Sequence, residues 1–434
     1  MRLLALLMLT IANITMGDVI KIPLKRIEPP MFKMIRDGTW ATQMKAIRAM
    51  RLQAANDRNA PIAQKLYDYW DLTYVGTITV GTPDQEFKAI LDTGSADLWV
   101  PDYRCHIGKL KVCEESVCDQ GLVCRVFCPR KMKCCKEYIV EDEEPNPCAA
   151  KNYFMSNESE TYTRMPGSRW TSHYGTGDAE GFWGNDTIRF GEAGGAQLVV
   201  PGCQFGQADR IAPFFANQPI DGILGMGFSA LSSRRVVPIF ERAWNLGLVE
   251  PIFTFYMEHA NKYSEEPVYG GMVTYGGEDR ENCGEIIAWQ NLTSATYWQF
   301  QMDGYSIGDN KTMTRYYVIS DTGTSFIGMP TAVADEVSEA FNATYKEEDD
   351  TYYVDCAAEG DDFTLIIGDN EYPIKRVNMI VEVEKNVCTL AVFPVFSWFG
   401  PQWFLGDPFI RQYCNIHDMK NKRIGFAPSL QDAR

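Results

Sequence analysis

Residues 87–101 read FKAILDTGSADLWVP, in which an Asp-Thr-Gly-Ser turn separates two apolar runs. The apolar runs predict two β-strands, and Gly94 permits the sharp turn between them. An acidic side chain at such a turn lies at the end of a strand, where it can face a cleft. A single Asp-Thr-Gly of this kind is nevertheless more often an ordinary surface turn.

The pattern recurs at residues 317–328, YVISDTGTSFIG, 229 positions further along the chain. Two such turns, each framed by apolar strands and half a chain apart, are far more specific than one. The repeat predicts two similar halves that bring Asp92 and Asp321 together about a two-fold axis.

The paired turns resemble those of the pepsin-like aspartic proteases of the cathepsin D and pepsin type. Each half also carries a second family signature, an apolar-apolar-Gly segment, at residues 221–225 and 403–407. The run GDPFIRQY at 406–413 is close to the family's C-terminal block, and SATYWQF at 294–300 is similar to nematode members. The resemblance covers residues 65–434. It implies a mainly β, bilobal acid protease fold, in which two β-barrel-like lobes related by a pseudo-two-fold axis flank a cleft.

The resemblance also implies an aspartic endopeptidase that needs neither a metal nor a cofactor. Two carboxyl groups about 3 Å apart in a partly desolvated site cannot both ionise, so they share one proton. The ionised group would take a proton from water, and the protonated group would donate to the substrate carbonyl oxygen. By resemblance, the catalytic residues are Asp92 and Asp321, and the residues that support this dyad are Thr93, Gly94, Ser95, Thr322, Gly323 and Thr324. The flap that closes over substrate contains Tyr174, Gly175 and Thr176, with Trp99 behind it. The apolar substrate pocket is lined by Ile90, Phe214, Ile220 and Ile223.

Two other classes of protein are alternatives to an active enzyme. A protease-fold binding protein without catalysis would show the loss of an aspartate or a bulky residue at a motif glycine, and neither change is present. A lectin-like or structural secreted protein would leave the duplicated motifs unexplained.

The first 17 residues have a basic start, an apolar run from residue 3 to 11 and small residues up to Gly17. This pattern predicts a secretory signal peptide, because the apolar run is too short for an anchoring helix. We therefore expect entry into the secretory pathway and an extracellular or lysosomal destination. Asn-X-Ser/Thr sequons begin at residues 157, 185, 291, 310 and 342, each a weak signal of glycosylation.

Charge divides the chain into two unequal parts. Residues 18–66 carry ten Lys or Arg against four acidic residues, whereas the chain from residue 67 onward has a net charge of −23. The acidic excess argues against nucleic acid or anionic membrane as a partner, and it suits an acidic compartment, although solubility alone would also explain it. We expect the basic segment to be a propeptide that lies across the cleft and inhibits the enzyme. A flexible basic tail is the alternative.

The segment from residue 19 to 26 resembles the opening strand of a pepsin-type propeptide, and residues 42–55 read as helix. In the family a propeptide lysine pairs with the catalytic carboxylates. The sequence around that position departs from the usual motif and does not identify the lysine. Protein or peptide substrates and this propeptide are the expected partners of a monomeric enzyme.

Thirteen cysteines fit an oxidising compartment, and eight of them lie between residues 105 and 148. The resemblance implies the bridges Cys105–Cys148 and Cys356–Cys388. Six cysteines fall in a 42-residue insertion between the first pair, where three further bridges of unspecified connectivity are expected. Zinc binding is the alternative, but a single nearby histidine disfavours it. The sequence does not indicate a disulfide partner for Cys203, Cys283 or Cys414.

The predicted domains are a signal peptide (1–17), a propeptide (18–66), an N-terminal lobe (67–257) with the Cys-rich insertion (105–148), and a C-terminal lobe (258–434). The insertion is interpreted as a recognition or positioning element at the rim of the cleft, with a tolerated surface insertion as the alternative. Other expected elements are strands at 69–83, 253–257, 271–275 and 297–307, a hairpin around 172–178, and helices near 213, at 238–248 and at 331–341.

Overall fold

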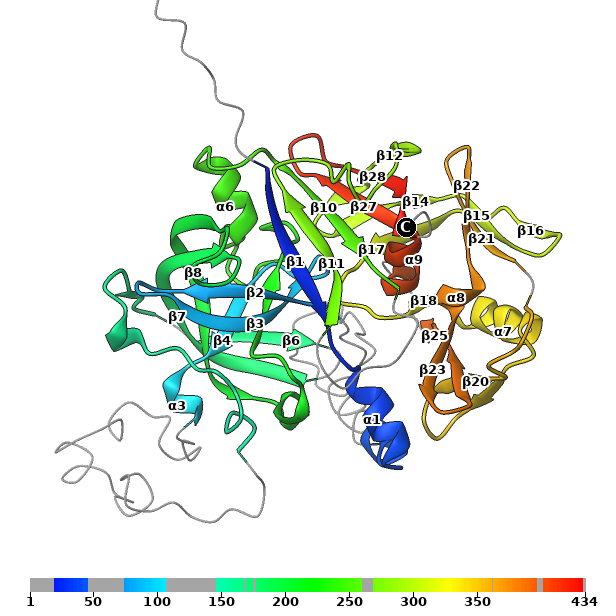
Figure 1. Cartoon of the computed structure of the whole chain (residues 1–434), viewed down its shortest axis with the longest axis horizontal. Coiled ribbons are helices and arrows are strands. Elements are labelled where there is room, and N and C mark those ends of the chain that lie inside the picture. Colours follow the sequence, from blue (N-terminus) through cyan, green and yellow to red (C-terminus); the bar gives the residue numbers. More distant parts are fainter. Residues whose placement is uncertain are drawn as a thin grey trace, which may run out of the picture.

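The computed structural model describes residues 19–45, 74–106, 146–167, 169–174, 177–259, 268–360, 362–395 and 401–431. This part of the chain is mainly β-strand and forms two lobes that lie side by side (Figure 1). The predicted bilobal fold is therefore confirmed. Among the described residues, no helix is both long enough and apolar enough to cross a membrane.

The first lobe is built around strands that pair in the order β3-β9-β4-β8-β7-β5. Its strands are β2 (Tyr74–Val80), β3 (Gln85–Asp92), β4 (Leu98–Pro101), β5 (Thr163–Arg164), β6 (Trp170–Tyr174), β7 (Gly177–Phe190), β8 (Leu198–Ile211) and β9 (Gly222–Gly225). Its helices are α3 (Tyr103–His106), η3 (Ser156–Glu158), η4 (Pro213–Asn217) and α6 (Ile239–Asn245). The predicted helix α6 begins after Pro238 and ends before Gly247, which adopts φ +70° and so terminates it.

The second lobe contains smaller sheets, ordered β13-β14-β17-β26-β18-β25, β16-β15-β21-β22 and β19-β20-β24-β23. Its strands are β12 (Ala288–Asn291), β13 (Ser294–Ala295), β14 (Trp298–Met302), β15 (Gly304–Ile307), β16 (Asn310–Thr312), β17 (Tyr316–Ser320), β18 (Ile327–Pro330), β19 (Thr344–Lys346), β20 (Thr351–Val354), β21 (Phe363–Ile367), β22 (Asn370–Ile374), β23 (Ile380–Glu384), β24 (Val387–Leu390), β25 (Val392–Val395) and β26 (Trp403–Leu405). Its helices are α7 (Thr331–Ala340), α8 (Arg376–Met379) and α9 (Asp407–Gln412).

The two lobes repeat one local arrangement of three strands. In the first lobe β9 lies between β3 and β4, parallel to β3 and antiparallel to β4. In the second lobe β26 lies between β17 and β18, again parallel to the first strand and antiparallel to the second. Each Asp-Thr-Gly turn joins the outer strands of its trio, and each apolar-apolar-Gly segment is the inner strand. This arrangement explains why the two signatures occur together in both halves of the sequence.

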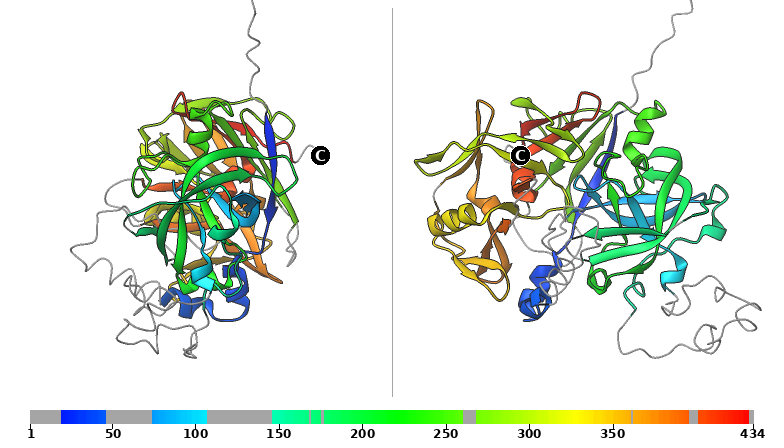
Figure 2. Two further views of the ribbon diagram at one scale, coloured as in Figure 1. Left: turned by 90° about the vertical axis from the view of Figure 1, so that its left-hand side faces the viewer. Right: turned by 180° about the vertical axis from the view of Figure 1, so that it is seen from behind.

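A central sheet joins the lobes, in the order β12-β28-β27-β10-β11-β1-β2. It contains β10 (Ile252–Met257), β11 (Val268–Tyr275), β27 (Tyr413–Asp418) and β28 (Arg423–Pro428). The N-terminal strand β1 (Ile20–Arg26) is inserted between β11 and β2, with Ile22 opposite Val273 and Lys25 opposite Val75. Figure 2 shows from behind how β1 runs between the lobes and leads to α1 (Pro30–Arg36).

The predicted bridges Cys105–Cys148 and Cys356–Cys388 are both present. A third bridge, Cys283–Cys414, ties the loop before β12 to β27, and it accounts for two of the cysteines that the sequence left unassigned. Cys203 is buried and forms no bridge. The six cysteines of the insertion and the proposed signal peptide lie outside the described residues.

Two expected elements differ in extent from the prediction. The single strand expected at 297–307 is broken at Asp303 into β14 and β15, which belong to different sheets. Asp303 causes the break because its main-chain N–H donates to Ile366 and its carboxylate accepts the N–H of Gly368, so the chain turns toward β21. Residues 40–45 are helical, and the rest of the helix expected at 42–55 lies outside the described residues.

An unusual buried histidine lies in the central sheet. The ring of His417 on β27 is fully buried, with its centroid 4.5 Å from that of Phe253 and 4.7 Å from that of Trp298. Burial lowers the pKa of the imidazole to about 3, against a weaker opposing effect of backbone groups of Phe253 and Asn415. These groups fall short of hydrogen-bond geometry with the ring nitrogens. The ring therefore stays neutral in the folded protein at mildly acidic pH.

His417 should make the protein less stable in acid. Since the unfolded chain binds a proton near pH 6.5 and the folded chain does not, stability is lost as the pH falls from 6.5 toward 3. Between pH 6.5 and 4 the loss is about 3 kcal/mol. We predict that His417→Leu has a smaller drop in melting temperature between pH 7 and pH 4 than the wild type. Parallel pH profiles for the two proteins would contradict the assignment.

Candidate active site

Asp92 and Asp321 occupy matching positions at the ends of β3 and β17, and both are buried. Each carboxylate accepts a hydrogen bond from a main-chain N–H of its own turn. Gly94 donates to Asp92 Oδ1 at 2.8 Å, and Gly323 donates to Asp321 Oδ1 at 3.0 Å. The hydroxyl of Thr324 donates to Asp321 Oδ2 at 2.8 Å. The structure thus presents the two carboxyl groups in nearly equivalent surroundings.

Reciprocal hydrogen bonds cross from one lobe to the other just beside these carboxylates. The main-chain N–H of Thr93 donates to Thr322 Oγ1 at 2.9 Å, and the N–H of Thr322 donates to Thr93 Oγ1 at 3.0 Å. Thr93 Oγ1 then donates to the carbonyl of Ser320 at 3.0 Å. All three residues are fully or almost fully buried, so the two turns are locked together without competition from water.

The motif glycines are required by the close approach of the two turns. A Cβ placed on Gly94 would lie 2.6 Å from Asp321 Oδ1, and one placed on Gly323 would lie 2.5 Å from Asp92 Oδ1. Either methyl group would have to displace a carboxylate of the opposite turn. Each glycine therefore borders the aspartate of the other lobe.

Burial raises the pKa of both carboxyl groups. For Asp92 the second contribution is the negative charge of Asp321, and the hydrogen bond from Gly94 opposes the rise. Ser95 also opposes it, although the geometry of its hydroxyl falls short of a hydrogen bond. For Asp321, hydrogen bonds from Thr324 and Gly323 oppose the effect of burial. One proton is therefore retained by the pair at a pH where an isolated aspartate would be ionised.

Tyr174, which is assigned to the flap, lies on β6 and pairs with Gly177 of β7. The indole N–H of the buried Trp99 donates to the hydroxyl of Tyr174 at 2.8 Å. Both rings also contact Phe215 of η4, at centroid distances of 5.4 Å for Trp99 and 6.3 Å for Tyr174. Gly175 and Thr176 lie outside the described residues.

The four residues assigned to the apolar pocket are buried in a single cluster. Ile90, Phe214, Ile220 and Ile223 share this cluster with Trp99 and Phe215. The same cluster includes residues of the N-terminal segment, namely Ile27, Met31, Phe32, Trp40 and Met44. The described part of the N-terminal segment therefore belongs to the same apolar cluster as the four residues assigned to the pocket.

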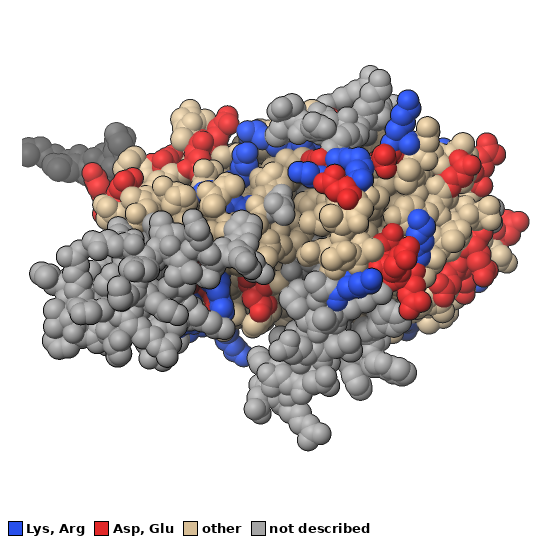
Figure 3. Space-filling model, turned by 90° about the horizontal axis from the view of Figure 1, so that it is seen from below, with Lys and Arg blue, Asp and Glu red and all other residues tan. Residues whose placement is uncertain are grey.

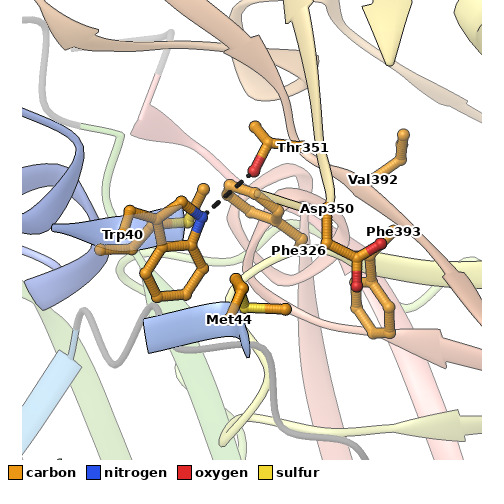
Figure 4. Close-up of a pocket in the computed structure, with 8 residues that line it drawn as sticks. Trp40, Met44, Phe326, Asp350, Thr351, Val392 and Phe393 are labelled. Carbon is orange, nitrogen blue, oxygen red and sulfur yellow. Dashed lines mark hydrogen bonds between the residues drawn. The ribbon is translucent and has the colours of Figure 1, made fainter. Parts of the chain in front are cut away.

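Trp40 anchors the N-terminal segment to the second lobe. Its indole N–H donates to the carbonyl of Asp349 at 2.9 Å and lies 3.4 Å from Thr351 Oγ1. Figure 4 shows Trp40 and Met44 facing Phe326, Val392 and Phe393 across a small pocket, which Met31 also lines. Sequence reasoning did not identify these anchors, since an apolar residue in a helix gives no sign of the lobe on which it packs.

Tyr297 is a second residue near the dyad that sequence reasoning missed. Burial raises the pKa of its phenol to about 12, and the charges of Asp321 and Asp92 add to the rise. In the sequence, the position of Tyr297 indicated only that it begins a strand.

The surface beside the N-terminal segment is acidic. In the view of Figure 3, Asp and Glu side chains gather toward the right-hand end of the molecule, over the second lobe. Residues 331–362, from α7 to the start of β21, include eleven acidic residues and one lysine. A basic segment is therefore attracted to this side of the molecule.

Comparison with known proteins agrees with this geometry. The profile of the eukaryotic aspartyl protease family matches residues 73–429. The chain belongs to this family. It is 44% identical over 429 residues to aspartic protease 2 of Necator americanus, covering 98% of this chain and 99% of the relative. Aspartic protease 6 of Caenorhabditis elegans is 41% identical over 400 residues, with 92% of each chain covered. Cathepsin E of Mus musculus is 30% identical over 443 residues, with 99% and 98% covered.

This aspartic protease is an endopeptidase of the pepsin-like kind, whose members hydrolyse peptide bonds at acidic pH. Across the described residues, no group of three or more His, Cys, Asp or Glu side chains is arranged to hold a metal ion.

The close approach at the motif glycines gives a direct test. We predict that Gly323→Ala lowers kcat/KM by at least about 100-fold, because its methyl group would move the Asp92 carboxylate and misplaced catalytic groups cost roughly that much. Gly284→Ala is a matched control, since its Cβ would meet only ordinary contacts of 3.5 Å or more. Equal activities of the two variants would contradict the geometry, provided that both are folded by circular dichroism.

Proposed function

We propose that this aspartic protease is made as an inactive zymogen in the secretory pathway, and that Asp92 and Asp321 hydrolyse protein substrates in an extracellular or lysosomal compartment. The main support for this proposal is the pair of hydrogen bonds between Thr93 and Thr322, which bring two buried carboxyl groups into one site. The proposed signal peptide, the three bridges and the name cathepsin E of one relative support this route.

The proposed mechanism uses one proton shared by the two aspartates. The ionised carboxylate removes a proton from water while the protonated carboxyl donates its proton to the substrate carbonyl oxygen. A C–O bond forms and gives a tetrahedral diol without a covalent enzyme intermediate. The proton then passes to the amide nitrogen, the C–N bond breaks, and an amine and a carboxylic acid leave. Raised pKa values of Asp92 and Asp321 keep the required proton in place.

The supporting residues have separate roles in this proposal. Thr93 and Thr322 hold the two turns, and the glycines allow close approach. Thr324 orients the outer oxygen of Asp321, and Ser95 is assigned the matching role at Asp92. Tyr174, with the neighbouring Gly175 and Thr176, closes over the substrate, and Trp99 orients the tyrosine hydroxyl. Ile90, Phe214, Ile220 and Ile223 accept the side chain that precedes the scissile bond.

Two kinds of contact support an inhibitory role for residues 18–66. The apolar residues Met31, Phe32, Trp40 and Met44 pack into the cluster that includes the proposed pocket. On β1, Lys21 Nζ lies 2.9 Å from both Asp279 Oδ1 and Glu281 Oε2. A substrate would have to displace the apolar contacts, while the ion pairs hold the strand in the central sheet.

The Lys21 ion pair supplies a response to acid. Burial acts to raise the pKa of Asp279, but hydrogen bonds from Asn282 and Lys21 outweigh it and the pKa lies below its ordinary value. A lowered carboxylate pKa stabilises the docked strand above the ordinary pKa of 3.8, and this contribution is lost as the pH falls through the lowered value. Acid therefore loosens β1.

The dyad is tested by Asp92→Asn and Asp321→Asn. Each should lower kcat/KM at pH 4 by about four orders of magnitude or more, since an amide can neither accept nor relay the shared proton. The melting temperature near pH 7 should not fall, because a neutral amide replaces a carboxyl whose ionisation burial opposes. Substantial hydrolysis by either folded variant would refute the mechanism.

The zymogen is tested by following the size and activity of the full-length chain between pH 3 and pH 7. The wild type should be inactive near neutrality and shorten in acid. The chain with Lys21→Met should shorten at a higher pH, because protonation of Asp279 is no longer needed to break its ion pair with residue 21. Lys25→Met is the control, since this exposed lysine lies on the same strand. Cleavage of substrate at pH 7 by the unprocessed chain would count against the zymogen, and identical pH midpoints for all three proteins would count against the Lys21 contact.

A further inference from the structure

A buried lysine lies outside the dyad and has no role in the mechanism above. Lys151 is the one lysine among the described residues whose side chain is buried, with 6% of its surface exposed. Its ammonium donates hydrogen bonds to the main-chain carbonyls of Gln218 and of Ile220, the latter at 2.8 Å. A buried ammonium is costly unless it is paired or fully hydrogen-bonded, so these two carbonyls determine where the side chain can lie.

The two carbonyls belong to residues 218–221, a short segment that includes the proposed pocket residue Ile220. The segment follows η4, which carries Phe214 and Phe215, and precedes β9. β9 runs parallel to β3, with Gly225 opposite Asp92. A shift of residues 218–220 would therefore move the aromatic rings of η4 on one side and Ile220 itself on the other.

Asp221, which follows Ile220, is held by Asn152, the neighbour of Lys151. Asp221 Oδ1 accepts the main-chain N–H of Asn152 at 2.9 Å, and Asp221 Oδ2 accepts the side-chain amide of Asn152 at 3.0 Å. The charge of Asp221 also attracts the ammonium of Lys151. Two adjacent residues, Lys151 and Asn152, thus bind three nearly consecutive residues of the segment. We call this pair the Lys151–Asn152 clamp.

Asp221 is also tied to β3, because its main-chain N–H donates to the carbonyl of Lys88 at 2.8 Å and its Oδ2 accepts the N–H of Lys88 at 2.9 Å. Gln218 has fewer restraints in the described part of the chain. The side-chain amide of Gln218 is buried, and neither its nitrogen nor its oxygen has a hydrogen-bond partner. The main-chain N–H of Gln218 donates only within η4, to the carbonyl of Phe215 at 3.2 Å. Among the described residues, Lys151 therefore supplies the side-chain hydrogen bonds to the main chain of residues 218–220, and Asn152 shares Asp221 with Lys88.

The clamp is itself anchored at the base of the Cys-rich insertion. The main-chain N–H of Lys151 donates to the carbonyl of Cys148 at 3.1 Å, and Cys148 forms a disulfide with Cys105 of α3. Phe154 continues the anchor, because its N–H donates to the carbonyl of Pro101 at the end of β4. The position of the clamp is thus set by a disulfide and by the strand that follows the first Asp-Thr-Gly turn.

We infer that Lys151 is a positioning residue for substrate selection: the Lys151–Asn152 clamp holds the wall formed by Phe214 and Ile220 in the shape that accepts a bulky apolar side chain before the scissile bond. This inference rests on the proposed function, in which that wall is the substrate pocket. Lys151 does not touch substrate. It acts on selection through the main chain of residues 218–220.

The test compares two short peptides that differ only in the residue before the cleaved bond, Phe in one and Ala in the other. In acid-processed wild-type enzyme the Phe peptide should have the higher kcat/KM. Lys151→Met keeps an apolar stem of similar length and removes the donor. It should lower the Phe-to-Ala ratio of kcat/KM about tenfold, mainly through a higher KM for the Phe peptide, since a disordered apolar pocket loses binding of that order. The Ala peptide should change by no more than about twofold.

Lys420→Met is the matched control, because this lysine is exposed in the turn between β27 and β28 and the variant makes the same change in charge. Its Phe-to-Ala ratio should equal that of the wild type. A lower melting temperature for Lys151→Met with an unchanged ratio would mean a merely structural lysine and would overturn the inference. If Lys151→Met does not fold, Asn152→Ala replaces it, since Asn152 is exposed and only its side-chain bond to Asp221 is lost. A ratio lowered about two- to threefold would then support the clamp, and an unchanged ratio would overturn it.

Failure of the proposed function is distinguishable from failure of this inference. If the wild type cleaves neither peptide, the proposed function is wrong. The clamp is then judged by calorimetric affinities of the two peptides for proteins that carry Asp92→Asn with and without Lys151→Met. A loss of preference for the Phe peptide in the double variant supports the clamp, and equal preferences overturn it.

Discussion

The hydrogen bonds exchanged between Thr93 and Thr322 are the constraint on which the active site depends. Each links a main-chain N–H of one lobe to a hydroxyl of the other, in a buried place where water cannot substitute. Because the two turns are joined in this way, Gly94 and Gly323 come close to the opposite carboxylates. The shared proton, and with it the chemistry proposed for Asp92 and Asp321, is a consequence of this contact between lobes.

Burial has a different consequence for each ionisable group in this protein. It raises the pKa of Asp92 and Asp321, which favours retention of the catalytic proton. It lowers the pKa of His417 and makes the central sheet sensitive to acid. It also lowers the pKa of Lys151 to about 8, yet this lysine stays charged in acid, where the enzyme is proposed to work. The same physical effect therefore serves catalysis at one place and opposes stability at another.

The N-terminal segment is held in two ways, by strand pairing and by packing of apolar side chains. β1 is a full member of the central sheet, and the residues around Trp40 fill space against the second lobe. Apolar packing changes little with pH, whereas the ion pair between Lys21 and Asp279 depends on it. In the proposed zymogen, packing supplies most of the affinity of the segment, and the charged contacts supply its response to acid.

The sequence by itself determined the duplicated turns, their flanking strands, the flap hairpin and two of the disulfides. These features are encoded within short stretches or by motifs that keep their spacing. Tertiary structure alone decided the pairing of Cys283 with Cys414, which are 131 residues apart, and the contact of Lys151 with a carbonyl 69 residues away. It also divided the strand expected at 297–307, because Asp303 bonds to β21. It brought Tyr297 near the dyad and Trp40 against the second lobe. A local pattern specifies which way a chain turns, but not which distant surface it will meet, since that choice follows from the packing of the whole fold.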